Sequence, residues 1–293
     1  MNRFLIVFSF LFTFHCMVKT PVATLKAILT LPTNSLSALS ISSGKLTPSF
    51  SSEITNYSVT VANATNSITV TPTAAETSLS ITVNGTSVAS GTASSAISLS
   101  TGSNTITVTI GGSTSYIILV TRLGADTYRI FLTSGKYNGN LGGITGADNI
   151  CNADSNKPEN ITFKAFLSRS GTRRACSTSN CGGGSGENLD WVLKPSATYV
   201  RSVDLLTIFV TNTSGIFVFG SLTNSFTGAN DSYWTGKNTA NDWTPSMYHC
   251  NNWTDDSSGV EGRPGTGNAL NYSSIGAPQV ACDTTKNLLC VEQ

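Results

Sequence analysis

The sequence predicts two domains, an all-β sandwich followed by an α+β domain. Three observations lead to this fold class. A chain of 293 residues has about the length of two domains. Apolar and polar residues alternate from residue 36 to 122, which is typical of strands with one buried face. From Thr127 onward the pattern becomes mixed, and the cysteines cluster there. We therefore expect a sandwich at 36–122, a linker at 123–127 and an α+β domain at 128–293.

The N-terminus carries the features of an export signal. A single basic residue, Arg3, precedes an apolar run from Phe4 to Phe14. A transmembrane helix needs about 20 apolar residues, whereas the core of a signal peptide needs only about 7 to 15. No later segment is apolar over the length of a membrane span. We therefore predict a signal peptide at residues 1–15 and export of the chain.

Cys16 directly follows this run, at the position where bacterial lipoprotein signals place an acylated cysteine. Thr13, Phe14 and His15 replace the small residues of the usual pattern, and ordinary cleavage near Ala23 is the alternative. Acylation of Cys16 would leave six of the seven cysteines, an even number, to pair. Each buried CH₂ of an acyl chain contributes about 0.8 kcal/mol to membrane binding. We expect Cys16 to be a lipid anchor, followed by a tether at 16–35, on the outer membrane or cell surface of a bacterium.

The predicted sandwich consists of short strands joined by tight turns. Its clearest alternating apolar positions are Tyr57, Val59, Val61, Leu79, Ile81, Val83, Ile106, Val108 and Ile110. Asn84-Gly85 and Gly111-Gly112 lie beside such strands, and these residue types adopt the positive φ that hairpins require. Turn signals recur about every ten residues, as in small β-sandwiches.

Three segments in this half carry a resemblance: LSISSGKLTPSFSSEITNYSVTVANATNSITVTPTA, ITVNGTSV and GSNTITVTI. They resemble the cadherin-like β-sandwich module of bacterial surface proteins over nearly all of 36–122. The resemblance implies a spacer or a binding platform without catalytic residues. Calcium bridging needs clustered carboxylates, and the segment has almost none, so we do not expect it.

The second domain begins with helical signals. In GGITGADNICNADSNKP, Thr145 can cap a helix and Asp148 stands three residues on, as in a capping box. The spacing of Ala147 and Cys151 places Cys151 on the inward face of this short helix, and Pro158 marks its stop. A core strand, FKAFLS, follows, and an apolar run, NLLCVEQ, ends the chain.

Four segments of this domain carry a further resemblance: GGITGADNIC, TFKAFLS, YWTGKNTANDWTPSMYHCNNWT and ACDTTKNLLCVEQ. They resemble the first helix, the following strand, the tryptophan-bearing middle and the closing strand of the endostatin domain of collagens, a variant of the C-type lectin-like fold. With the export signal, the chain resembles the endostatin-like lipoproteins of leptospires over residues 128–293. This family implies binding to host matrix proteins, complement regulators and plasminogen.

Cysteines in the second domain point to disulfides. Six cysteines allow many pairings, and their spacing does not select one. The resemblance to the collagen domain implies pairing of Cys151 with Cys290 and of Cys250 with Cys282, which leaves Cys176 and Cys181 to pair locally. Chain-entropy arguments assign the long Cys151–Cys290 link about 4 to 5 kcal/mol.

The residue inventory argues against several classes of function. With 17 basic and 16 acidic residues, the net charge of +1 gives no field for holding nucleic acid. His249 is the only histidine after the signal, too few for a structural zinc site, and it has no evident carboxylate partner for hydrolysis. The sugar-binding motifs of calcium-dependent lectins are missing, and CGGGSGEN lacks the lysine of a phosphate-binding loop. We predict no metal, no cofactor and no catalytic residues.

Basic residues gather in FKAFLSRSGTRRAC, where they are Lys164, Arg169, Arg173 and Arg174. Arginines near the matching segment of the collagen domain contribute to heparin binding, so the resemblance implies a polyanion-binding surface for a glycosaminoglycan. The plainer interpretation is a solvated loop. Affinity that falls steeply with salt would distinguish the first from the second.

Together these features predict an exported, lipid-anchored bacterial surface protein in which the sandwich lifts a disulfide-braced, lectin-like head away from the membrane. The expected function is non-enzymatic, namely adhesion or binding of host matrix proteins, complement regulators or plasminogen. The alternative is a structural envelope protein, or a glycan-binding or heparin-binding protein, with no host protein ligand.

Overall fold

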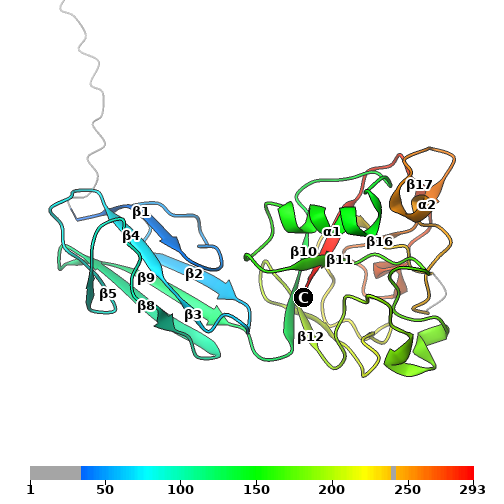
Figure 1. Cartoon of the computed structure of the whole chain (residues 1–293), viewed down its shortest axis with the longest axis horizontal. Coiled ribbons are helices and arrows are strands. Elements are labelled where there is room, and N and C mark those ends of the chain that lie inside the picture. The colour runs from blue at the N-terminus through cyan, green and yellow to red at the C-terminus, as the bar shows by residue number, and fades with distance from the viewer. Residues whose placement is uncertain (1–33, 239–241) are drawn as a thin grey trace, which may run out of the picture.

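The computed structural model describes residues 34–238 and 242–293. The predicted signal peptide, the predicted lipid anchor Cys16 and nearly all of the predicted tether lie outside these residues. The described chain forms two lobes joined end to end (Figure 1). No helix in these two described ranges has the length and the apolar character that crossing a membrane would require.

The first lobe is a β-sandwich. Its larger sheet has five strands in the order β2-β9-β8-β5-β6, in which β2 and β9 run parallel and the other neighbours antiparallel. The pairs β1–β4 and β3–β7 contribute to the same core. The strands are β1 Leu36–Ile41, β2 Asn56–Val61, β3 Ser67–Ile68, β4 Val70–Ala74, β5 Ile81–Val83, β6 Thr86–Val88, β7 Ile97–Ser98, β8 Gly102–Ile110 and β9 Thr114–Arg122.

Alternation of apolar and polar residues places the side chains of this lobe. On β8, Ile106, Val108 and Ile110 are fully buried, whereas the residues between them are only half-buried. Successive residues of a strand point to opposite faces, so every second side chain enters the core. Asn84 and Gly85 form the turn between β5 and β6 with φ of 48° and 81°. The predicted alternating strands and this hairpin are confirmed.

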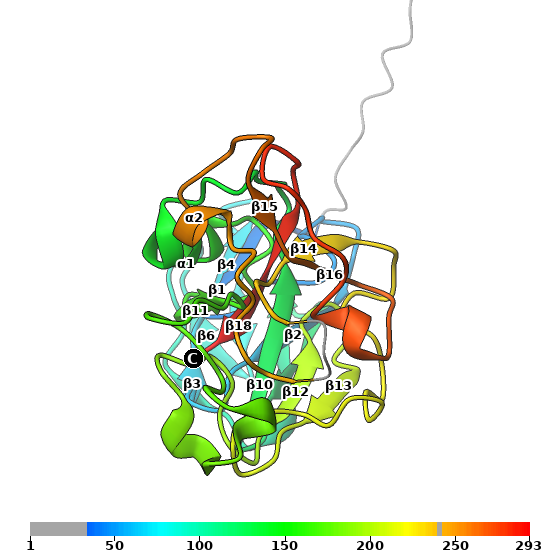
Figure 2. The same ribbon diagram turned by 90° about the vertical axis from the view of Figure 1, so that its right-hand side faces the viewer.

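The second region is rich in strands and poor in helix. Its main sheet follows the order β13-β12-β10-β18-β14-β16, with β11 also paired to β18. The C-terminal strand β18 is buried at every residue and lies between β10 and β14 (Figure 2). The strands are β10 Thr127–Leu132, β11 Phe163–Ala165, β12 Thr198–Arg201, β13 Thr207–Val210, β14 Ser232–Trp234, β15 Glu261–Gly262, β16 Pro264–Thr266, β17 Val280–Ala281 and β18 Asn287–Glu292. The helices are α1 Gly143–Ala153, α2 Cys250–Trp253 and the 3-10 turns η1 Ser179–Cys181, η2 Gly184–Glu187 and η3 Tyr272–Ser274.

Helix α1 begins at Gly143, before the predicted cap. Its N-cap is Gly142, which has a φ of 73°, and no side chain caps the helix. Thr145 lies inside the helix, and the Asp148 carboxylate bonds to groups outside it. The predicted capping box is therefore wrong, because glycine supplies the left-handed entry and tertiary contacts engage the acid. Cys151 is buried on the inward face, as predicted.

Three disulfides brace the second region. They join Cys151 to Cys290 and Cys250 to Cys282, the two pairs that the collagen resemblance implies, and Cys176 to Cys181, the pair expected to form locally. The first links residues that are 139 apart in sequence and ties α1 to the central strand β18. This disulfide thus joins a helix near the start of the region to a strand near its end.

The sandwich contacts the second region through its own edge strand. Strand β2 lies at the edge of the five-stranded sheet, where backbone groups are open to other partners. Arg129 Nη1 donates a hydrogen bond to the Thr60 carbonyl oxygen at 3.2 Å, and the Ala62 N–H donates to Glu159 Oε2 at 2.8 Å. Charged side chains of the second region therefore occupy part of this edge and bind the lobes together.

Candidate functional site

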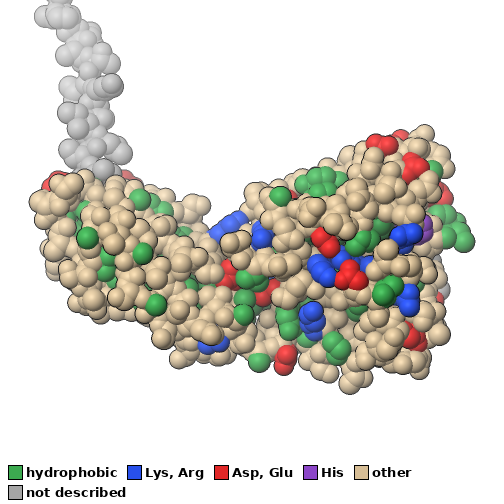
Figure 3. All heavy atoms as spheres, in the orientation of Figure 1, with side chains coloured by type: hydrophobic (Ala, Val, Ile, Leu, Met, Phe, Trp, Pro, Cys, Tyr) green, Lys and Arg blue, Asp and Glu red, His purple; other side chains and the backbone are tan. Residues whose placement is uncertain are grey.

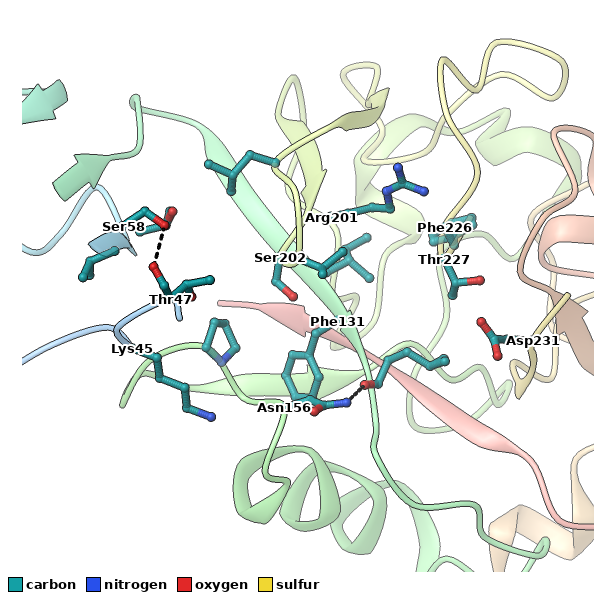
Figure 4. Close-up of a pocket in the computed structure, with 17 residues that line it drawn as sticks. Lys45, Thr47, Ser58, Phe131, Asn156, Arg201, Ser202, Phe226, Thr227 and Asp231 are labelled. Carbon is teal, nitrogen blue, oxygen red and sulfur yellow. Dashed lines mark hydrogen bonds between the residues drawn. The ribbon is translucent and has the colours of Figure 1, made fainter. Parts of the chain in front are cut away.

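A groove of about 460 Å³ lies where the two lobes meet (Figure 4). One wall comes from the sandwich, around Lys45, Thr47 and Ser58. The other comes from the second region, from the turn between β12 and β13 and from the loop at 226–231. Ligand pockets typically measure about 300 to 1,000 Å³, so this groove can hold several side chains. Neither lobe forms it alone.

The sandwich wall is fixed by backbone pairing. Thr47 and Ser58 exchange two backbone hydrogen bonds, with N–O distances of 2.9 and 2.8 Å. The exposed Lys45 reaches toward the second region, where its Nζ donates a hydrogen bond to the Ser155 carbonyl oxygen. No carboxylate of the described chain forms an ion pair with Lys45, so its positive charge is not neutralised.

The turn between β12 and β13 gives the opposite wall a neutral, partly apolar surface. Arg201 Nη2 lies 2.7 Å from Asp204 Oδ2 within this turn, so the two charges balance each other. Val203 at the tip is 83% exposed, and Leu205 beside it is half-buried. The turn thus presents aliphatic side chains to the groove, with its own charges already paired.

Asp231 lies on the side of the groove away from Lys45 (Figure 4). Its backbone oxygen accepts a hydrogen bond from Gly267 N at 2.8 Å. Within the described chain, the half-buried Asp231 carboxylate has neither a hydrogen bond nor an ion pair. The groove therefore carries an unneutralised positive charge on the sandwich side and an unneutralised negative charge on the other.

A buried ion-pair network closes the junction of the lobes. Arg129 Nη2 lies 2.6 Å from Glu159 Oε2, and Arg129 Nε lies 2.6 Å from Glu292 Oε2. The side chains of Arg129 and Glu159 have no exposed surface. Arg129 also donates to Thr60, which lines the groove. Burial of two charges is costly unless each finds partners, so this network fixes one geometry of the junction.

The Glu159 carboxylate is held ionised by its partners. Burial alone would raise its pKa, but hydrogen bonds from the hydroxyls of Ser43 and Thr65 and from Arg129, with the charge of Arg129, lower the pKa below its ordinary value. Both hydroxyls belong to the sandwich. The ionised form of Glu159 is therefore the form that binds the two lobes.

Two of the basic residues predicted to bind polyanions form ion pairs with carboxylates of the second region. Arg173 is 1% exposed, and its guanidinium nitrogens lie 2.8 Å from Asp148 and 2.5 Å from Asp190. Lys164 also pairs with Asp190. A guanidinium so enclosed offers no charge to an external polyanion, so the assignment of Arg173 to a binding surface is corrected to a structural role.

The other two predicted basic residues are only half-buried. Arg174 donates hydrogen bonds to the backbone oxygens of Ser170 and Glu187. Arg169 forms no ion pair with any residue of the described chain, and it lines a small hollow with the first turn of α1. The structure thus brings Lys164 and Arg173 together around one carboxylate and leaves Arg169 and Arg174 outside that cluster.

Other titratable groups of the described ranges make contacts within turns and within the core. No group of three or more His, Cys, Asp or Glu side chains within the described ranges could hold a metal ion. His249 Nδ1 accepts a hydrogen bond from Asn252 N at 3.0 Å, and burial lowers its pKa. Lys237 is fully buried, with its Nζ 3.2 Å from the Trp243 carbonyl oxygen and 4.0 Å from the Trp191 ring centre. The contact of His249 thus belongs to the turn that begins α2, and the contacts of Lys237 belong to the core.

Sequence reasoning missed the groove and the buried ion pair beside it. Lys45, Glu159 and Asp231 lie in three distant segments, and none stands in a recognisable motif. Glu159 follows Pro158, and nothing in the sequence around it shows that its carboxylate is buried and therefore needs a partner. The fold was needed to identify that partner.

Comparison with known families assigns the first lobe. Residues 134–270 match a family described as a protein of unknown function (DUF1554), which adds no activity. A search of curated proteins found no match. Residues 36–123 match the family described as a cadherin-like beta sandwich domain, in agreement with the strand order above. The N-terminal lobe is therefore a cadherin-like β-sandwich domain.

Proposed function

We propose that this chain is an exported, lipid-anchored bacterial surface protein that binds a host protein and catalyses no reaction. In this proposal the second region is an endostatin-like head with the C-type lectin-like fold, and Cys16 carries the lipid. The supporting observation is the groove between the lobes, because both lobes build it and the buried Arg129–Glu159 pair fixes its shape. A preformed concave surface loses little freedom on binding, which favours affinity.

The covalent and surface chemistry supports an extracellular role. Three disulfides persist only in an oxidising compartment, which favours export. Figure 3 shows that the sandwich carries few charged side chains on the face in view, whereas both signs of charge gather on the second region. Such a distribution suits a spacer that carries a recognition head, and the net charge of +1 favours a protein ligand over a nucleic acid.

Binding to an immobilised panel tests the proposed function. The probe is the chain from residue 16 onward with Cys16→Ser, passed over laminin, fibronectin, plasminogen, complement factor H and heparin. We expect saturable binding to at least one of the proteins, with a Kd of about 10 μM or tighter, and loss of binding after the disulfides are reduced. Binding to none of these ligands would contradict the proposal and favour a structural envelope role. Binding to heparin alone would favour the polyanion alternative.

A separate experiment tests the anchor. Expression of the full chain in a bacterial host with labelled palmitate should yield a labelled protein that partitions into detergent. Cys16→Ser should lose the label and move to the aqueous phase. Equal labelling of both forms, or an unlabelled parent cleaved near Ala23, would contradict the lipid assignment while leaving the binding proposal open to its own test.

A further inference from the structure

The groove between the lobes carries unmatched charges of opposite sign. Lys45 on the sandwich side bonds to a neutral backbone oxygen of Ser155, and no described carboxylate pairs with it. Asp231 on the other side has no polar partner for its carboxylate in the described chain. The third charged residue of the groove, Arg201, is neutralised by Asp204 at 2.7 Å. The groove therefore carries two unpaired charges, positive at Lys45 and negative at Asp231.

Apolar side chains occupy the wall between these charges. Leu132 and Leu205 are half-buried in the groove, and Val203 is 83% exposed at its rim. Exposed aliphatic surface is unfavourable in water, so a ligand gains free energy by covering the apolar wall, and it gains electrostatic complementarity by placing opposite charges near Lys45 and Asp231. Lys45, Ser202 and Asp231 line the same groove, with Lys45 and Asp231 toward its opposite sides in Figure 4, so one ligand in the groove can face both charges.

We propose that this groove binds an extended segment of a protein ligand that carries an acidic side chain toward Lys45, an aliphatic side chain against Leu205, and a basic side chain toward Asp231. This inference rests on the proposed function and names the chemistry of its ligand. The charge pattern argues for the segment: a uniformly acidic or basic chain would place a like charge against Asp231 or Lys45, which costs affinity. The volume of about 460 Å³ suits a few residues rather than a folded domain.

Peptide titration followed by NMR tests the proposal. The protein is the chain from residue 16 onward with Cys16→Ser, and the probes are four end-capped peptides: Glu-Leu-Val-Lys, Lys-Val-Leu-Glu, Glu-Leu-Val-Glu and Lys-Val-Leu-Lys. At about 5 mM peptide, a concentration that detects millimolar affinity, the two mixed-charge peptides should shift the amide signals of Ser58, Ser202 and Thr227. They should bind about fivefold more tightly than the uniformly charged peptides, as expected for roughly 1 kcal/mol of charge matching.

Charge-reversal variants make the test specific. Lys45→Glu should shift the preference to Lys-Val-Leu-Lys, and Asp231→Lys should shift it to Glu-Leu-Val-Glu. Lys136→Glu and Glu76→Lys change the net charge by the same amounts at exposed sites outside the groove, and they should leave the preference unchanged. Equal binding of all four peptides, no shifts in the groove, or unchanged preference in both groove variants would overturn the inference. Tighter binding of free lysine or glutamate than of the peptides would do the same, because it would indicate a small-molecule site.

The outcome is separable from that of the binding panel. If the Lys45→Glu and Asp231→Lys variants retain full affinity for a ligand found in the panel, the proposed function stands and the groove is not its site. If no panel ligand binds but the peptide preferences reverse as stated, the ligand class stands and the choice of host proteins is wrong.

Discussion

Glu159 in the second region lies 2.6 Å from Arg129 and 2.8 Å from the backbone nitrogen of Ala62 in the sandwich. One carboxylate thus joins a cation of its own region to the edge strand of the other lobe. The hydroxyls of Ser43 and Thr65 complete its coordination from the sandwich side. A side chain with so many partners specifies the angle between the lobes as well as holding them together, because each hydrogen bond depends on direction.

Replacing this carboxylate should loosen the junction. Glu159→Gln keeps the shape but removes the charge that Arg129 faces, and breaking a buried ion pair typically costs about 3 to 5 kcal/mol. We expect a loss at the low end of that range, about 3 kcal/mol, because Glu292 still pairs with Arg129. Urea unfolding measures the loss, and small-angle scattering should show a wider distribution of lobe orientations.

Glu53→Gln is the matched control, since Glu53 is exposed and has no ion pair in the described chain. It should change the free energy of unfolding by less than about 0.5 kcal/mol. If Glu159→Gln unfolds at the parent urea concentration and scatters like the parent, Glu159 does not determine the junction.

The same carboxylate should make the junction sensitive to acid. The pKa of Glu159 is lower in the folded protein than its ordinary value of 4.5, because its hydrogen bonds outweigh burial. A depressed carboxyl pKa gives stability that is present above pH 4.5 and is lost as pH falls through the folded pKa. The stability difference between the parent and Glu159→Gln should therefore be constant from pH 7 to pH 5 and shrink below pH 4.5. A difference that stays constant down to pH 3 would show that Glu159 does not titrate in this window.

The long disulfide should contribute more than the short one. Cys151 and Cys290 are 139 residues apart, whereas Cys176 and Cys181 are 5 apart. Closure of the longer loop removes more entropy from the unfolded chain, so the chain-entropy relation gives about 5 kcal/mol for the first and about 2 kcal/mol for the second. Paired Cys→Ser variants compared by urea unfolding measure both. Equal losses in the two variants would mean that loop closure does not govern these bonds, and loss of cooperative unfolding only in the first would agree with the prediction.

The sandwich could be predicted from sequence because its signals are local. Period-two alternation places Ile106, Val108 and Ile110 in the core, and the residue types Asn84-Gly85 fix a turn. Each of these follows from neighbours within a few positions. The two long disulfides could be predicted only through resemblance, because the spacing of six cysteines is compatible with many pairings, and Cys176–Cys181 followed as the local pair that remained.

Charge placement in the second region could not be predicted in the same way. Arg173 and Arg174 are adjacent and chemically identical, yet one is enclosed by Asp148 and Asp190 and the other is half-buried beside backbone oxygens. The sequence predicts Asp148 as part of a helix-capping box, whereas in the structure its carboxylate pairs with Arg173. Partners 25 residues apart, as in the hydrogen bond between Arg173 and Asp148, leave no periodic trace in the sequence. The groove was missed for the same reason, since its walls come from distant segments.

The buried amine of Lys237 should give the protein a stability that rises with pH. Burial lowers its pKa well below the ordinary value of 10.5, and its amine donates a hydrogen bond to the Trp243 carbonyl oxygen. Between the folded pKa and 10.5 the unfolded chain binds a proton that the folded chain does not, so stability increases as pH rises through that window. Lys237→Met keeps an unbranched side chain against Trp191 and removes the titration. It should flatten the pH dependence up to pH 10 and raise the free energy of unfolding at pH 7 by about 1 to 3 kcal/mol.

Lys136→Met, at an exposed position, is the control and should leave the slope of stability against pH unchanged. Urea unfolding at several pH values between 6 and 10 measures the slope in all three proteins. A fall in stability at pH 7 on Lys237→Met would mean that the amine stays protonated and that its attraction to the Trp191 ring, 4.0 Å away, outweighs the cost of burial. Whether Lys237→Met raises or lowers the free energy of unfolding at pH 7 therefore decides between two states of this side chain. A rise indicates a neutral buried amine, and a fall indicates a cation stabilised by the two tryptophans.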